Sequence, residues 1–314
     1  MKLVKRRSFI VGLGVAGAAS AIPSLCEAAA EGKFAVRFGI VTDLHYGDIP
    51  DESEPLEVGG QRFCRQSKRK LADAIRVFNA RHVDFAIELG DFKDFSHDRA
   101  GTLAHLEEIE RTFSCFKGPR YHAFGNHDFD CLTPEDLAPR LPNDGRPMSR
   151  GYYSFVKNGI TFIVLDACYD SGFKHYSCNN PWFDANVPVE ELVWLREELA
   201  SARGPAVVFC HQRLDPSASP RHLVRNSAEV RGILEKSGKV KAVFTGHQHL
   251  GSVYDHNGIL YYSLIAQALD SGPLANSFAE VAVAADGSVR VTGYFNAVSY
   301  GSAKGDMALT AEVL

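Results

Sequence analysis

The chain has 314 residues, of which 45% are hydrophobic and 23% charged, and its formal net charge is −4. This composition is typical of a globular protein with a large core, and no 18-residue apolar run follows the N-terminal segment, which excludes a bundle of transmembrane helices. Removing residues 1–30, which carry a net charge of +3, leaves −7 on the rest of the chain. Such a mildly acidic protein is a poor candidate for binding long duplex nucleic acid, which favours basic surfaces.

Residues 1–30 have the layout of a secretory signal peptide. A basic start is followed by a short Gly- and Ala-rich apolar stretch at 9–22, and then by alanines at 28–30. The pair Arg6-Arg7 resembles a twin-arginine signal. We therefore expect export, most simply to the periplasm, with no stable membrane span in the mature protein. The alternative is an uncleaved anchor helix.

Beyond the signal, short β-branched and aromatic runs alternate with amphipathic helical patterns, and Asn158-Gly159 marks a hairpin turn within 152–167. The alternation predicts strands at 34–42, 83–89, 121–124, 206–210 and 241–245, and helices at 67–81, 102–116, 189–202 and 222–238.

The C-terminal part has a different pattern. Turns at Asn257-Gly258 and Asp286-Gly287 interrupt apolar runs, which predicts antiparallel hairpins. Alternating β and α elements followed by a β-rich end indicate a layered α/β fold with mixed sheets. We expect one domain over residues 31–305 and a short tail at 306–314.

Each of five predicted strands is followed by Asp, Asn or His. In chain order, the residues that follow the strands are Asp43 and His45, then Asp91 and Asp94, then Asn126, His127 and Asp128, then His211, and finally His247 and His249. One such residue is usually a turn former or a helix cap. Turn chemistry alone would also have placed Ser, Thr and Pro at these ends. Because ligands bind at the carboxyl ends of strands in open α/β sheets, the five ends together predict a binding site.

These residue types suit a metal centre. Carboxylate and amide oxygens with imidazole nitrogens favour Mn, Fe, Zn or Co over Mg or Ca, and no thiolate is required. A carboxylate shared by two cations would set them roughly 3.5–4 Å apart. Two cations so placed can polarise a phosphoryl oxygen and lower the pKa of a bound water toward ~7.

The motifs "DLH" (43–45), "GDFKD" (90–94), "GNHD" (125–128), His211 and "GHQH" (246–249) resemble those of the calcineurin-like metallophosphoesterases. The resemblance covers about residues 34–296. It implies a four-layer αββα sandwich of two mixed β-sheets. It also implies two metal ions (Mn, Fe or Zn) and hydrolysis of a small phosphorylated substrate by a hydroxide that bridges them.

The resemblance also implies roles for individual residues. Asp43, His45 and His249 would hold the first metal, Asn126, His211 and His247 the second, and Asp91 would bridge the two. His127 would act as acid or charge stabiliser beside the leaving oxygen, and Asp94 would orient its ring.

Further stretches, among them "FCRQSKRKLADAI" and "VVFCHQRLDP", look like the manganese-dependent ADP-ribose/CDP-alcohol diphosphatase branch. That branch often carries Gln where this chain has His45, so the chain departs from the branch at this position of the first metal motif. Three neighbours of the metal motifs are candidate substrate contacts. Arg65 would contact a second phosphate or form a surface salt bridge, and Tyr46 and Phe129 would stack on a base or pack internally. The loop 177–186 carries aromatic residues that would cap the site.

The sequence therefore favours a metal-dependent hydrolase of phosphodiester or nucleotide-diphosphate bonds. A broad phosphomonoesterase shares the same metal core and is the alternative. A non-catalytic binding scaffold is a second alternative, which the complete set of ligand types makes less attractive.

Overall fold

The computed structural model describes residues 34–48, 61–146, 148, 150–178, 180–272 and 274–301. The predicted signal segment and the tail at 306–314 lie outside these residues, so both remain predictions. Within the described part of the chain, no helix is both long enough and apolar enough to cross a bilayer.

The described strands form two mixed sheets. The first sheet has the order β11-β10-β1-β2-β3, in which β1, β2 and β3 are parallel and β10 and β11 antiparallel to their neighbours. Its strands are β1 (Phe34–Val41), β2 (Phe85–Glu88), β3 (Arg120–His122), β10 (Ser277–Ala284) and β11 (Val289–Phe295). The predicted hairpin at Asp286-Gly287 joins β10 to β11.

The second sheet has the order β4-β5-β6-β7-β9-β8. Strands β5, β6, β7 and β9 are parallel, and β4 and β8 pair antiparallel at the two edges. Its strands are β4 (Tyr153–Lys157), β5 (Ile160–Val164), β6 (Ala206–Phe209), β7 (Val240–Thr245), β8 (Leu250–His256) and β9 (Ile259–Ile265). The predicted turns at Asn158-Gly159 and Asn257-Gly258 join β4 to β5 and β8 to β9.

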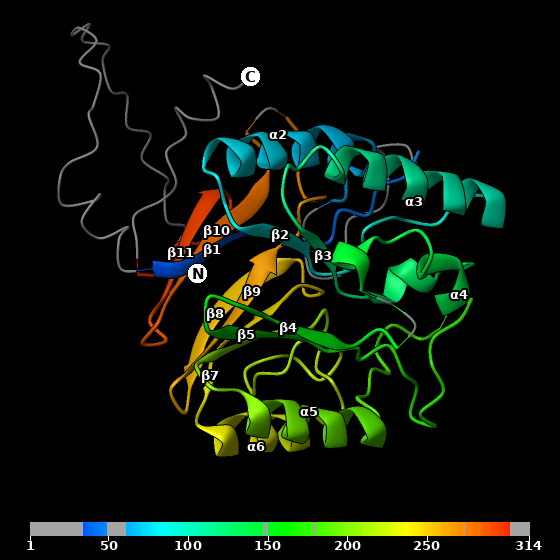
Figure 1. The fold of residues 1–314 in the computed structure, drawn as a ribbon. Helices are drawn as coiled ribbons and strands as arrows, with labels where there is room; N and C mark the ends of the chain where they lie inside the picture. Colours follow the sequence, from blue (N-terminus) through cyan, green and yellow to red (C-terminus); the bar gives the residue numbers. More distant parts are fainter. Residues whose placement is uncertain are drawn as a thin grey trace, which may run out of the picture. The chain divides into compact units, whose positions relative to one another are not determined.

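Helices cover the outer face of each sheet (Figure 1). The first sheet packs against α2 (Ser67–Ala80) and α3 (Arg99–Phe113), and the second against α5 (Val189–Ser201) and α6 (Ser227–Ser237). The predicted four-layer αββα sandwich of two mixed sheets is therefore confirmed. The remaining helical elements are short: η1 (Cys64–Gln66), η2 (Asn126–Phe129), α4 (Pro134–Leu137) and η3 (Asn143–Gly145).

Aromatic side chains fill the space between the two sheets. The Phe38 ring on β1 stacks on that of Phe85 on β2, with centroids 4.7 Å apart. From the second sheet, the rings of Phe162, Phe209 and Phe244 meet Phe38 edge-on at 5.6, 5.6 and 6.0 Å. Edge-to-face contacts are the favoured geometry of aromatic pairs. They fix the sheets face to face, so that strand ends of both sheets meet at one edge.

One predicted helix begins later than expected. The pattern at 222–238 predicted a helix throughout, whereas α6 begins at Ser227. The amide of Asn226 pairs with the backbone of Val187, accepting its N–H at 3.0 Å and donating to its carbonyl at 2.8 Å. Val224 donates its N–H to the carbonyl of Arg213. These contacts draw residues 222–226 into a loop, which places His222 beside the strand ends.

Candidate metal centre and its pocket

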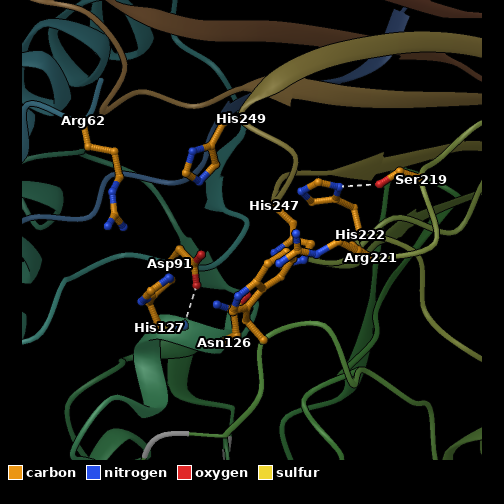
Figure 2. Close-up of a pocket in the computed structure, with 10 residues that line it drawn as sticks. Arg62, Asp91, Asn126, His127, Ser219, Arg221, His222, His247 and His249 are labelled. Carbon is orange, nitrogen blue, oxygen red and sulfur yellow. Dashed lines mark hydrogen bonds between the residues drawn. The ribbon is translucent and has the colours of Figure 1, made fainter. Parts of the chain in front are cut away.

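Strand-end residues of both sheets meet at one pocket, whose lining includes Asp91, Asn126, His247 and His249 (Figure 2). The first sheet supplies Asp43 after β1, Asp91 after β2 and Asn126 after β3, and the second supplies His211 after β6 and the pair His247 and His249 after β7. We call these residues, together with His45, the floor of the pocket. The pocket encloses about 480 Å³.

The first group of potential ligands consists of Asp43, His45, Asp91 and His249, whose ligand atoms all lie within 4.8 Å of one another. The Nε2 atoms of His45 and His249 are 3.1 Å apart. The Nε2 atom of His249 lies 3.4 Å from Asp43 Oδ1, and that of His45 lies 3.6 Å from Asp91 Oδ2. Four N and O donors at this spacing fit a divalent cation of the Mn, Fe or Zn kind.

The second group shares Asp91 with the first and adds His211 and His247. His211 Nε2 lies 3.1 Å from Asp91 Oδ2. Several buried side-chain atoms of the described residues lack a hydrogen-bond partner, and three of them belong to the floor: His211 Nε2, His247 Nε2 and Asn126 Oδ1. A buried polar atom without a partner is costly, and three aimed at one place fit a second cation. The residues present thus fit two divalent cations that share one carboxylate.

The backbone at the floor adopts an unusual conformation. Positive φ angles occur at Asp43 (50°), His45 (46°), Asp91 (54°), His247 (65°) and His249 (58°). This left-handed region is sparsely populated by residues other than glycine, and it persists only where surrounding structure enforces it. Five such residues in one pocket indicate that the geometry of the floor is held against local strain, as at many functional sites.

Two glycines of the motifs are required by close approach. A Cβ atom on Gly246 would collide with the hydroxyl of Thr42 and the carboxylate of Asp43. A Cβ atom on Gly125 would collide with the backbone nitrogen and carboxylate of Asp91. Each glycine therefore lets the end of its own strand lie against the aspartate carboxylate at the end of a different strand.

Hydrogen bonds fix the two aspartates of the floor. The N–H of His247 donates to both carboxylate oxygens of Asp43, at 3.1 and 3.0 Å, so β1 and β7 are tied together. The N–H of His127 donates to Asp91 Oδ1 at 2.7 Å. Asp128 accepts from the backbone of Asp91, Phe92 and Gly125. Sequence analysis noted Asp128 without a role, and the structure shows that it positions the Asp91 loop.

Burial and charge set the ionisation of the floor. Burial alone would raise the pKa of Asp91, but the charges of His211 and His127 hold it well below its usual range. Burial lowers the pKa of His247 well below its usual range, and nearby His211 lowers it further. Burial opposes protonation of His211 too, yet the charge of Asp91 raises its pKa to about 10. An ionised Asp91 and a neutral His247 are the forms that bind metals, whereas His211 has to release its proton to bind one.

His127 lies beside the floor with its ring held by a carboxylate. The resemblance implied that Asp94 orients this ring, whereas the structure places Asp130 nearer, with its Oδ2 2.6 Å from His127 Nδ1. Asp94 Oδ1 lies farther away, at 3.7 Å. Buried Lys93 donates to the carbonyls of His127 and Asp130 and fixes this turn. Asp130 was visible in the sequence only as the third residue after His127.

The three candidate substrate contacts lie outside the residues that line the pocket. Exposed Arg65 pairs with exposed Asp48, the alternative of a surface salt bridge. Phe129 is fully buried and packs on Phe124 and His175. The half-buried Tyr46 ring packs edge-on against His105.

Other residues form the wall of the pocket, by which we mean Arg62, Trp182, Ser219, Arg221 and His222. Trp182 comes from the loop 177–186, as expected for a loop that caps the site. Arg62 lies three residues before the predicted Arg65, and its Nη1 is 3.0 Å from His45 Nδ1 and 3.2 Å from Asp94 Oδ2. Sequence reasoning missed Arg62, Arg221 and His222, since no strand end or spacing marks them.

A pocket floored by two ligand groups that share a carboxylate, at the strand ends of a four-layer sandwich, defines a dinuclear metallophosphoesterase. The chain belongs to the calcineurin-like phosphoesterase family, whose model matches residues 36–251. The protein is accordingly a hydrolase of phosphoric ester or anhydride bonds.

Individual relatives narrow the comparison. The chain is 32% identical over 290 residues to the manganese-dependent ADP-ribose/CDP-alcohol diphosphatase of Oryza sativa subsp. japonica. The alignment covers 79% of this chain and 88% of that protein. The Arabidopsis thaliana protein of the same name is 30% identical and covers 78% and 90%. The crystal structure of a dimetal phosphatase from Danio rerio has the same fold, with a TM-score of 0.76 and 20% identity over 85% of this chain and 98% of that one.

Proposed function

We propose that the protein is a manganese-dependent diphosphatase that hydrolyses nucleotide diphosphates of the ADP-ribose or CDP-alcohol kind. The observation that carries the proposal is the pair of ligand groups joined by Asp91, together with the buried atoms of His211, His247 and Asn126 that lack a hydrogen-bond partner. The relatives of that name match about four fifths of the chain at 30–32% identity and support the substrate class.

When bound, two cations would lower the pKa of a coordinated water and neutralise charge on the phosphate. The roles of the chain's own side chains follow from their positions. Asp43 and Asp91 are held by backbone N–H groups, so they present their oxygens without rearranging. Such preorganisation reduces the cost of reaching the transition state.

His127 supplies the proton. Burial opposes its protonation, but Asp91, Asp130 and Asp94 raise its pKa to about 9, so the ring carries a proton at neutral pH. Because Asp130 holds Nδ1, Nε2 would pass its proton to the leaving oxygen. A water that has released a proton to solvent bonds through its oxygen to phosphorus. The bond to the leaving oxygen breaks as that oxygen takes the proton of His127, and the two products separate as phosphate monoesters.

A substrate panel tests the proposal. The manganese-loaded protein would be assayed with ADP-ribose, CDP-choline, a model phosphodiester and a model phosphomonoester, each with and without chelator. We expect chelator-sensitive turnover led by ADP-ribose or CDP-choline. Faster monoester turnover would identify a phosphatase instead. No turnover of any substrate by metal-loaded protein would favour a binding scaffold.

We also propose that the protein is exported through its twin-arginine segment, on the support of the sequence alone. Cell fractionation of the full chain and of a variant with Arg6→Lys and Arg7→Lys tests this. Export of the original chain is expected, with retention of the variant. Equal distribution of the two would refute the proposal.

A further inference from the structure

Two loops form part of the wall, and the rings of their Trp182 and His222 lie 5.5 Å apart. Figure 2 shows Arg62 and His127 at the left of the pocket and Ser219 and His222 at the right. The loop 177–186 contributes Trp182, and the loop 213–226 contributes Arg221. The guanidinium carbon of Arg221 lies 4.7 Å from the centroid of the Trp182 ring, and that ring lies 5.6 Å from the ring of His247. A flat cation on a flat aromatic ring therefore borders the metal floor.

The loop that carries Arg221 is held from within. Buried Arg213 forms a bidentate pair with Asp215, with contacts of 2.8 and 2.7 Å. The Arg213 backbone donates to the carbonyl of His222 at 3.1 Å and accepts from the N–H of Val224 at 2.9 Å. Residue 221 therefore lies in a backbone fixed on both sides.

The two loops are also tied to each other. Arg225 Nε lies 2.7 Å from Asp184 Oδ1, and its backbone N–H donates to the carbonyl of Ala185 at 2.9 Å. The paired hydrogen bonds between Asn226 and Val187 add a second tie. Because these contacts hold residues 184–187 and 222–226 in place without a ligand, binding against the Trp182–Arg221 pair would cost little conformational entropy.

Unpaired nucleobases stack on aromatic rings and on arginine guanidinium planes, and such stacking tolerates different bases. If the leaving group lies beside His127, the group that stays on phosphorus extends toward the side of the pocket that holds Ser219 and His222 (Figure 2). We propose that Trp182 and Arg221 form a platform that binds the nucleobase of this retained nucleoside. The inference rests on the proposed function, because it uses His127 as the marker of the leaving-group side.

A matched pair of phosphodiesters tests the platform. Thymidine 5′-(p-nitrophenyl phosphate) and methyl p-nitrophenyl phosphate share the leaving group and the charge, and differ only in the retained group. The manganese-loaded protein should prefer the thymidine ester in kcat/KM. Arg221→Ala and Trp182→Ala should each reduce this preference by about 5- to 100-fold, with the methyl ester little changed. Trp182→Phe should keep most of it.

The controls separate the platform from the metal floor. Arg196→Ala removes another exposed arginine, one that pairs with Glu229 on the α5–α6 layer, and should leave the preference unchanged. Metal content and thermal midpoint would be measured for every variant. Equal loss of both esters, no loss of preference, or no preference in the original protein would each overturn the platform. Failure to hydrolyse ADP-ribose while the thymidine preference persists would refute the proposed substrate and leave the platform standing.

Discussion

The floor and the wall of the pocket are built in different ways. Floor residues directly follow strands, are mostly buried, and owe their positions to backbone hydrogen bonds and left-handed φ angles. The wall comes from loops and is more exposed, and its side chains meet through ion pairs and ring stacking. The comparison indicates that the residues of the reaction centre belong to short strand-end motifs, whereas the residues that select the substrate lie in loops outside any recognisable motif.

Removing the carboxylate shared by both ligand groups should have the largest effect. We expect Asp91→Asn to reduce kcat by more than about 100-fold and to lower the bound metal, because one substitution weakens both cation sites. Metal analysis and steady-state kinetics would measure this. Asp48→Asn is the matched control, since Asp48 is exposed and its described ion pair is with Arg65, outside the floor. Full metal content with normal kcat in Asp91→Asn would show that the floor is not the reaction centre.

The ring of His127 offers the next test, at the border between floor and wall. Asp130→Asn removes the 2.6 Å partner of Nδ1 and should lower kcat by about 10- to 100-fold with metal content retained, because the ring loses its fixed orientation. Asp94→Asn should lower kcat less, since Asp94 lies 3.7 Å away. The reverse ranking of the two variants would return the orienting role to Asp94.

A buried ionic network beneath the floor should make the free energy of unfolding of the protein depend on pH. His122 lies 3.3 Å from both Glu88 and Glu110, and Glu88 accepts the N–H of Gly90, next to Asp91. Burial opposes protonation of His122, but Glu110 and then Glu88 raise its pKa to about 9. Burial raises the pKa of Glu88 itself to about 7, so at pH 6 the pairing of His122 is mainly with Glu110. A raised pKa means that the stabilisation is complete below the unfolded pKa of about 6.5 and is lost as pH rises through about 9.

Denaturant unfolding of the original protein and of His122→Gln at several pH values would measure this. The difference in unfolding free energy between them should shrink by on the order of 3 kcal/mol from pH 6 to pH 10. A constant difference between the two proteins would contradict the ionic network.

The sequence predicted the sheets and the floor because both depend on local patterns. Each apolar run forms a strand, and each strand end carries the Asp, Asn or His that the sequence places there, so the positions of Asp43, Asp91 and His247 needed no knowledge of distant contacts. Asp130 and Arg221 could not be predicted in this way. Their positions depend on how Lys93 ties down one turn and how Asn226 pairs with Val187, contacts between segments far apart in the chain. The same Asn226 contact explains why residues 222–226 form a loop despite a helical pattern.

The smallest effect on kcat/KM is expected at Arg65, which was predicted to contact the substrate because it is close in sequence to a metal motif but lies outside the pocket lining. Arg65→Ala removes an exposed ion pair with Asp48, which is worth at most about 1 kcal/mol, and should change kcat/KM for ADP-ribose by less than about twofold. Steady-state kinetics would be compared with those of Arg221→Ala, which removes the same side chain from the wall. A tenfold or larger loss in Arg65→Ala would mean that the substrate extends past the described wall toward η1. In that case the residues that choose the substrate would include one marked by the sequence beside a motif, and the contrast between floor and wall would be weaker than the structure indicates.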